Sequence, residues 1–223
     1  MKRRWYEGAW SLLYPFDVQC LLCKGERQMG NGSGLCQTCL QGLQSCAVDG
    51  RQTQGVYAPF TYEGTARELV RLLKFHNVRR AAIPLAQAMA AGLQGRGPFD
   101  ALVPVPLHTK RQRERGYNQC AVLCRAMAQE MNVPVAEDWL LRAVDTPHQV
   151  GLSRAQRQEN VKGAFVIARP VPGQRVLLVD DVWTTGATCT ACAQVLQNAG
   201  AKVTICTAAL AKEHETGIFS DQM

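Results

Sequence analysis

The sequence predicts an α/β fold in which a mostly parallel sheet carries helices on both faces, preceded by a small cysteine-rich module. Three observations support this prediction. Short apolar segments alternate with amphipathic ones after residue 55, two Cys-x-x-Cys pairs occur before it, and one apolar segment ends in two aspartates followed by a Thr- and Gly-rich loop. A chain of 223 residues accommodates one medium domain plus a small module, and is too short for two full enzyme domains.

Composition excludes several classes of protein. A hydrophobic fraction of 47% rules out general disorder, and no segment approaches the 18 consecutive apolar residues of a membrane-spanning helix. The basic start at Met1–Arg4 is followed by a short mixed stretch with Glu7 and no small-residue cleavage site. We therefore expect no export signal, no membrane insertion and a cytoplasmic location. The net charge of +7 permits an anionic partner without requiring nucleic acid.

The chain divides into two expected domains, at residues 1–55 and 56–223, because residues 50–55 are typical of a linker. The second domain contains the alternating elements, and Thr65 with Glu68 is typical of a helix-capping box. The elements expected there are strands at Val56–Tyr62, Ala101–Pro106, Phe165–Ala168, Val176–Val179 and Val203–Leu210, and helices from Thr65, at Ala81–Leu93, at Asn118–Met131 and at Ala187–Asn198.

The first domain holds five of the ten cysteines, and four of them form two Cys-x-x-Cys pairs. In a reducing compartment such pairs are more often metal ligands than disulfides. Two such turns supply the four thiolates of a tetrahedral Zn²⁺ site, which leaves no open position for catalysis. We therefore predict a structural zinc, with redox-active or incidental cysteines as the alternative. The predicted ligands are Cys20, Cys23, Cys36 and Cys39.

The most specific segment of the sequence is Val176–Thr188. Its first four residues predict a buried strand, and Asp180 and Asp181 follow where open α/β sheets bind ligands. The loop Thr184–Thr188 opens directly into a helix, so its N–H groups and hydroxyls would form a nest for a phosphate dianion. Two acids beside such a nest fit a site that also holds sugar hydroxyls and a magnesium ion. The alternative is that the acids only cap the strand end.

This segment closely resembles the 5-phosphoribosyl-1-pyrophosphate (PRPP) signature of the type I phosphoribosyltransferases. The wider pattern resembles one branch of them, the ComF family, whose members commonly carry a zinc-ribbon-like N-terminal segment. Many relatives have a second set of Cys-x-x-Cys pairs, whereas here only Cys46 remains, so we expect one zinc. The residues that carry the wider resemblance are Phe60–Gly64, Leu73–Phe75, Val103–Leu107, Arg111, Arg115–Gln119, Gln149, Leu152, Arg157, Asn160, Gly163–Phe165 and Asn198–Ala201.

The resemblance implies the type I phosphoribosyltransferase fold and a Mg²⁺-dependent transfer of the phosphoribosyl group, with pyrophosphate as the leaving group. Asp180 and Asp181 would orient the ribose hydroxyls and stabilise positive charge on the ring. Arg111 and Arg115 lie in the basic run between the strand at Ala101–Pro106 and the helix at Asn118–Met131, which we expect to be a loop. They are candidates for the pyrophosphate, with Arg115 preferred as the catalytic residue and a solvated face as the alternative. The residues implied for the 5-phosphate are Thr184, Thr185, Gly186, Ala187 and Thr188.

The polar stretch Arg142–Lys162 corresponds to the flexible loop that closes over the substrate in type I phosphoribosyltransferases. Arg154, Arg157 and Asn160 are its candidates for reaching the substrate on closure. Nothing in the sequence identifies the acceptor of the phosphoribosyl group, and the oligomeric state stays open.

A second hypothesis belongs to another class: a nucleotide- or single-stranded-DNA-binding accessory protein that keeps the fold without turnover. Arg67, Arg71 and Lys74 recur at helical spacing, and Phe75 and Tyr62 would add stacking to nucleic acid. A solvated surface is the alternative for this stripe. Members of the ComF family are linked with competence and the use of incoming DNA, which implies single-stranded DNA or a protein of the competence machinery as a partner.

Overall fold

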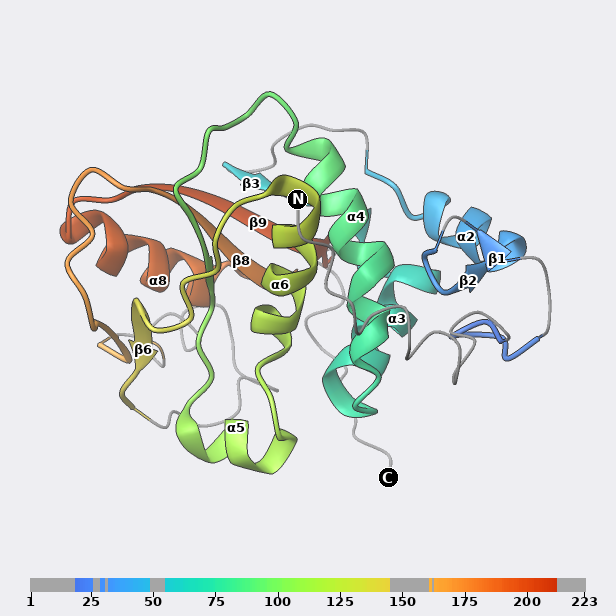
Figure 1. Cartoon of the computed structure of the whole chain (residues 1–223). Coiled ribbons are helices and arrows are strands. Elements are labelled where there is room, and N and C mark those ends of the chain that lie inside the picture. The colour runs from blue at the N-terminus through green and yellow to red at the C-terminus, as the bar shows by residue number, and fades with distance from the viewer. Residues whose placement is uncertain are drawn as a thin grey trace, which may run out of the picture.

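The centre of the protein is a five-stranded parallel sheet, seen in the computed structural model of Figure 1. The structure describes residues 19–25, 29–30, 32–48, 55–144, 161 and 163–211. In the sheet, β8 lies between β5 and β9, and β3 and β4 both pair with β9. The strands are β3 (Val56–Tyr57), β4 (Phe60–Thr61), β5 (Ala101–Pro104), β8 (Arg175–Trp183) and β9 (Lys202–Leu210).

Helices cover both faces of this sheet, as predicted. Alternate residues of β8 enter two hydrophobic clusters: Leu177 and Val179 pack with residues of α3, α4 and α6, whereas Val176 and Leu178 pack with residues of α8. Burial on both faces explains why this strand is a continuous apolar run rather than an alternating one. The helices concerned are α3 (Gly64–Phe75), α4 (Ala82–Gly92), α6 (Gln119–Met131) and α8 (Ala187–Asn198).

The cysteine-rich module consists of a short antiparallel pair, β1 (Met29–Gly30) with β2 (Leu35–Cys36), followed by α2 (Gln37–Gln44). Its buried residues belong to the same hydrophobic cluster as α3 and α4. The backbone N–H of Thr61 donates to the carbonyl of Cys46, which ties the end of the module to β4. The module is therefore packed onto the larger domain, and the division near residue 55 stays a prediction.

Several boundaries differ from the sequence prediction. The segment 56–62 forms two strands because Pro59 between them has no N–H to donate to a ladder. The predicted capping box is wrong: α3 begins at Gly64, which leaves Thr65 inside the helix, and no side chain caps it. The basic segment after β5 forms a short helix, α5 (Thr109–Arg115), and the 3-10 turn η1 (Arg79–Ala81) precedes α4.

A further antiparallel pair, β6 (Leu140–Arg142) with β7 (Phe165–Ile167), was not expected as a hairpin-like unit. Arg142 is therefore part of a strand and is buried, with its guanidinium 5.4 Å from the centroid of the Phe165 ring. Most of the predicted flexible loop, including Gln149, Arg154, Arg157 and Asn160, lies outside the described residues. Within the described ranges, no helix combines the length and apolar character needed to cross a membrane.

Candidate functional sites

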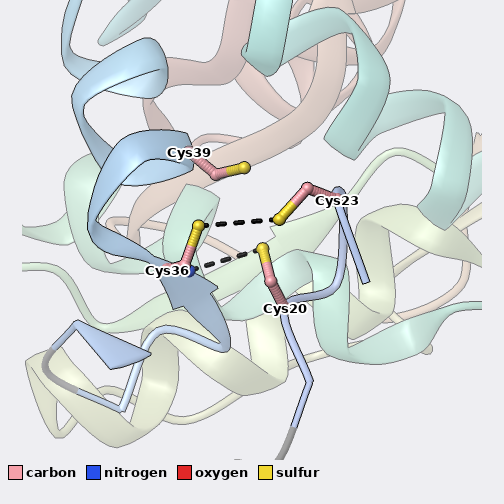
Figure 2. A group of neighbouring side chains, drawn as sticks. All are labelled: Cys20, Cys23, Cys36 and Cys39. Atoms are coloured by element: carbon pink, nitrogen blue, oxygen red, sulfur yellow. Dashed lines mark hydrogen bonds between the residues drawn. The ribbon is translucent and has the colours of Figure 1, made fainter. Parts of the chain in front are cut away.

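The four predicted zinc ligands converge in the module (Figure 2). Their Sγ atoms all lie within 4.8 Å of one another, and the Sγ atoms of Cys23 and Cys36 are 3.7 Å apart. A disulfide would require about 2.05 Å. By contrast, Zn–S bonds of about 2.3 Å in a tetrahedron place neighbouring sulfurs about 3.8 Å apart. The spacing therefore fits a metal centre, and the donor set suits a structural ion. The members are Cys20, Cys23, Cys36 and Cys39.

The backbone around this cluster favours thiolate at one position. Burial opposes ionisation of Cys20, but N–H groups of Cys36, Cys23 and Leu22 outweigh it and lower the pKa of Cys20 to about 6. Burial together with the neighbouring thiols raises the pKa of Cys39 to about 12. Four thiols so close together cannot all ionise until a cation neutralises their charge. A bound metal ion would supply that charge.

The second cluster lies at the carboxyl end of β8, where Asp180 and Asp181 are only 9% and 4% exposed. Oδ1 of Asp180 accepts hydrogen bonds from Cys120 Sγ at 3.2 Å and from the Asp181 N–H at 2.8 Å. Its Oδ2 accepts from Cys189 Sγ at 3.3 Å. Cys120 stands at the start of α6 and Cys189 in the first turn of α8, so helices from both faces of the sheet fix this carboxylate.

Burial and the adjacent charge of Asp181 raise the pKa of Asp180. Burial next to Asp180 also raises the pKa values of Cys120 and Cys189 well above their usual range. Both thiols therefore stay protonated at neutral pH and act as hydrogen-bond donors, not as nucleophiles. The sequence pattern does not predict their contact with the acid.

Asp181 is held by a residue that is distant in the sequence. Nζ of Lys74, at the end of α3, lies 3.1 Å from both carboxylate oxygens. Burial alone would lower the pKa of Lys74, but the negative charges of Asp181 and Asp180 outweigh it and raise the pKa. Lys74 is therefore a member of this site, although its helical spacing predicted a place on a basic surface stripe. The one feature of the sequence that pointed to a functional role for Lys74 is that it lies within Leu73–Phe75, a segment that carries the resemblance to the ComF family.

The predicted phosphate loop leads from β8 into α8. Gly186 is the N-cap residue of the helix, with a φ of +75°, and as a glycine it has no side chain to cap the first turn. A Cβ at Gly186 would stand 2.2 Å from Cζ2 of Trp183, so the Trp183 ring covers the glycine. Among the described residues, none forms a hydrogen bond with the buried hydroxyl of Thr185. An uncapped helix start beside an unpartnered hydroxyl fits an anion such as phosphate.

Two of the residues predicted to bind pyrophosphate lie within the described ranges. Arg111 and Arg115 are both on α5, at the lower edge of Figure 1. Arg115 donates to the Gln119 side chain, and its guanidinium is 5.9 Å from the ring centroid of Phe75. Its contacts in the described structure therefore connect α5 with α3 and α6, not with the acid pair. Phe75 is 64% exposed.

Only part of the predicted basic stripe on α3 is exposed to solvent. Arg71 is exposed and lies 3.9 Å from Glu68, whereas Lys74 turns to Asp181. Tyr62 is buried, so the expectation that it stacks with nucleic acid is wrong. Phe75 remains the accessible aromatic residue of the pair.

Comparison with known proteins identifies the family. The phosphoribosyl transferase domain family matches residues 117–222. Competence protein F of Haemophilus influenzae is 29% identical over 215 residues, which cover 83% of this chain and 93% of that protein. DNA utilization protein YhgH of Salmonella typhi is 36% identical over 139 residues, or 60% of this chain and 61% of that protein. The chain belongs to the ComF family.

A relative with a different name supports the fold of this ComF protein. An adenine phosphoribosyltransferase of a Synechococcus strain is 32% identical over 140 residues, which cover 61% of this chain and 70% of that protein. Together with the parallel sheet and its helical layers, these matches confirm the type I phosphoribosyltransferase fold and the general transferase class. The cysteine cluster accompanies that fold as a small metal-binding module of the zinc-ribbon kind.

Proposed function

We propose that this ComF protein binds PRPP together with Mg²⁺ and transfers the phosphoribosyl group to an acceptor. The observation that carries the proposal is the order of groups along one segment. A buried acid pair lies in the second half of β8, two residues before a loop whose Thr185 hydroxyl has no hydrogen-bond partner among the described residues, and a helix start with a glycine N-cap follows. These groups suit, in turn, the ribose hydroxyls and the 5-phosphate of one ligand.

Each residue would act by binding, orientation or charge. The loop Thr184–Thr188 would hold the 5-phosphate through N–H groups and hydroxyls. Asp180 and Asp181 would accept hydrogen bonds from the ribose hydroxyls and stabilise the positive charge that develops on the ring. The acceptor forms a bond to C1 as the bond from C1 to the pyrophosphate oxygen breaks, and pyrophosphate leaves with the bonding electrons.

The leaving group needs neutralisation. Magnesium would supply it, held mainly by substrate oxygens and water near the acid pair. Arg115 and Arg111 on α5 are the described candidates to bind the pyrophosphate, and Arg154 and Arg157 remain candidates from the loop outside the described residues. We also propose one structural zinc in the module and a cytoplasmic location.

Release of pyrophosphate from PRPP, measured over a panel of acceptors, tests the proposal. We expect the double substitution Asp180→Asn/Asp181→Asn to lower the rate about 100-fold or more, because it removes the charges that stabilise the transition state. Asp100→Asn is the matched control, since Asp100 pairs with Arg175 at the opposite edge of the sheet. Equal rates for the double variant and the wild type would contradict the proposal.

A second candidate function is a binding protein without turnover that serves the uptake or use of DNA. Two observations favour it: relatives are named competence protein F and DNA utilization protein, and Phe75 is exposed beside the Arg115 guanidinium. An exposed aromatic ring next to a cation suits the stacking of a single-stranded base. PRPP binding without turnover for any acceptor would favour this second function.

A further inference from the structure

Lys74 connects two parts of the molecule that are distant in sequence. Its Nζ meets the carboxylate of Asp181 across a separation of 107 residues, at 3.1 Å from each oxygen. The Lys74 side chain as a whole keeps 29% exposure, while its ammonium lies directly against the buried acid pair. A metal ion that bound both acids would have to share that place with the ammonium.

The groups behind Lys74 resemble a cation site. Ligand atoms of Cys120, Asp180 and Asp181 lie within 4.8 Å of one another. Two adjacent carboxylates repel each other in a buried setting, and a nearby positive charge relieves that repulsion. In this structure the charge of Lys74 does so. Within the described residues, Oδ2 of Asp181 accepts no well-aligned hydrogen bond and meets only the Lys74 ammonium at 3.1 Å, so Lys74 occupies the place that a metal cation would take.

We propose that Lys74 is the resident cation of the acid pair and keeps free divalent metal ions off the site until substrate brings them. An ammonium within about 4 Å of a divalent ion repels it strongly. A polyanionic substrate carries negative charge of its own, which offsets this repulsion and gives the ammonium a second partner. Only the identity of that substrate rests on the function proposed above.

Titration of the substrate-free protein with Mn²⁺, followed by electron paramagnetic resonance, tests the role of Lys74. We expect the wild type to bind Mn²⁺ at the acid pair only weakly. Lys74→Met should bind one Mn²⁺ per chain at least tenfold more tightly, and adding Asp181→Asn should abolish the gain. Lys74→Arg keeps the charge and should behave as the wild type does.

Lys202→Met is the matched control, because Lys202 is exposed at the first residue of β9 and its substitution changes the net charge equally. A gain in this control would show a general charge effect and overturn the proposal. So would tight Mn²⁺ binding by the wild type, or a folded Lys74→Met variant without any gain. If circular dichroism shows that Lys74→Met is unfolded, Lys74→Gln replaces it, since glutamine can still donate to Asp181.

The same protein preparations separate this inference from the proposed function. Mn²⁺ binding in the absence of substrate does not depend on turnover or on the identity of the acceptor. A gain in Lys74→Met together with no PRPP binding by the wild type would uphold the role of Lys74 and contradict the proposed function. PRPP binding by the wild type, together with no gain in Mn²⁺ affinity in Lys74→Met, would support the proposed function and contradict the role of Lys74.

Discussion

In the N-terminal module four thiols meet one another, whereas at the edge of the sheet two thiols meet a carboxylate. Backbone N–H groups lower the pKa of Cys20 to about 6, which favours a thiolate that can bind a metal. Burial beside Asp180 raises the pKa values of Cys120 and Cys189, which favours neutral donors. The same residue type is therefore a ligand in one cluster and a positioning group in the other, and the surroundings decide which.

The two clusters also differ in what holds them together. The four cysteines are brought together by short turns in a module whose apolar residues share the hydrophobic cluster of α3 and α4. The carboxylate of Asp180 is fixed by α6 and α8, which pack on opposite faces of β8. The first arrangement should depend on its bound ion, and the second should persist without any ligand.

Removal of the metal should give the largest effect. We expect one zinc per chain, and we expect Cys36→Ser to lose it and to lower the midpoint of thermal unfolding strongly. Structural zinc sites contribute roughly 10 kcal/mol to the folding of small zinc-binding peptides. Metal analysis by mass spectrometry and circular dichroism on heating provide the two measurements.

Cys46→Ser is the control for this experiment. Cys46 is buried in the same module, but its thiol donates to the carbonyls of Gly42 and Glu63, which a serine hydroxyl can also do. This variant should keep its zinc. Retention of one zinc by Cys36→Ser, or two zinc ions in the wild type, would contradict the predicted four-cysteine site.

Sequence reasoning succeeded where the signal was local. The buried strand, the two acids and the helix that follows lie close together in the sequence, so their pattern predicted α8 and the first part of β8. The strand was predicted over Val176–Val179, whereas β8 spans Arg175–Trp183 and contains both acids. It failed where the contact joins distant segments. Helical spacing placed Lys74 with Arg67 and Arg71 on one stripe, because periodicity cannot tell which residue of a stripe reaches across to another element. In the same way, periodicity does not show that Cys120 and Cys189 share Asp180 as a partner.

Two local patterns also gave wrong element boundaries. The capping-box match at Thr65 and Glu68 is genuine as a sequence, yet α3 begins one residue earlier, at Gly64 with a φ of +47°. The basic run after β5 was expected to remain a loop. It forms α5 instead, which ends at Gly116 in the left-handed conformation that glycine adopts without steric cost.

Gly186→Ala tests whether the close contact between Gly186 and the Trp183 ring shapes the predicted phosphate loop. A Cβ there would overlap the Trp183 ring, and the φ of +75° costs a residue other than glycine about 1–2 kcal/mol. We expect PRPP affinity, measured by calorimetry, to fall about tenfold or more, which corresponds to about 1.4 kcal/mol, because relief of the overlap with the Trp183 ring would move the loop away from the phosphate. Zinc content should stay unchanged, because the module is independent of this loop.

Gly173→Ala is the matched control for the loop. Gly173 has nearly the same backbone conformation, with a φ of +72°, but a Cβ there would meet no atom within 4 Å. This substitution should cost stability without changing PRPP affinity. Equal losses of affinity in the two variants would show that the Trp183 contact does not shape the site.

The smallest effect concerns the thiol donors. Cys189→Ala removes one hydrogen bond from Asp180 and should weaken PRPP binding about fivefold, since such a bond contributes about 1 kcal/mol. Cys189→Ser should keep most of the affinity, because a hydroxyl can donate to the same oxygen. Cys192→Ala is the control, as Cys192 is equally buried on α8 but is not a donor to Asp180 in the described structure. If Cys192→Ala weakened binding as much as Cys189→Ala, the thiols at the sheet edge would act only by filling space. The thiols of the module would then differ from those at the sheet edge because the former bind a metal and the latter only pack, and hydrogen bonding to Asp180 would have no role.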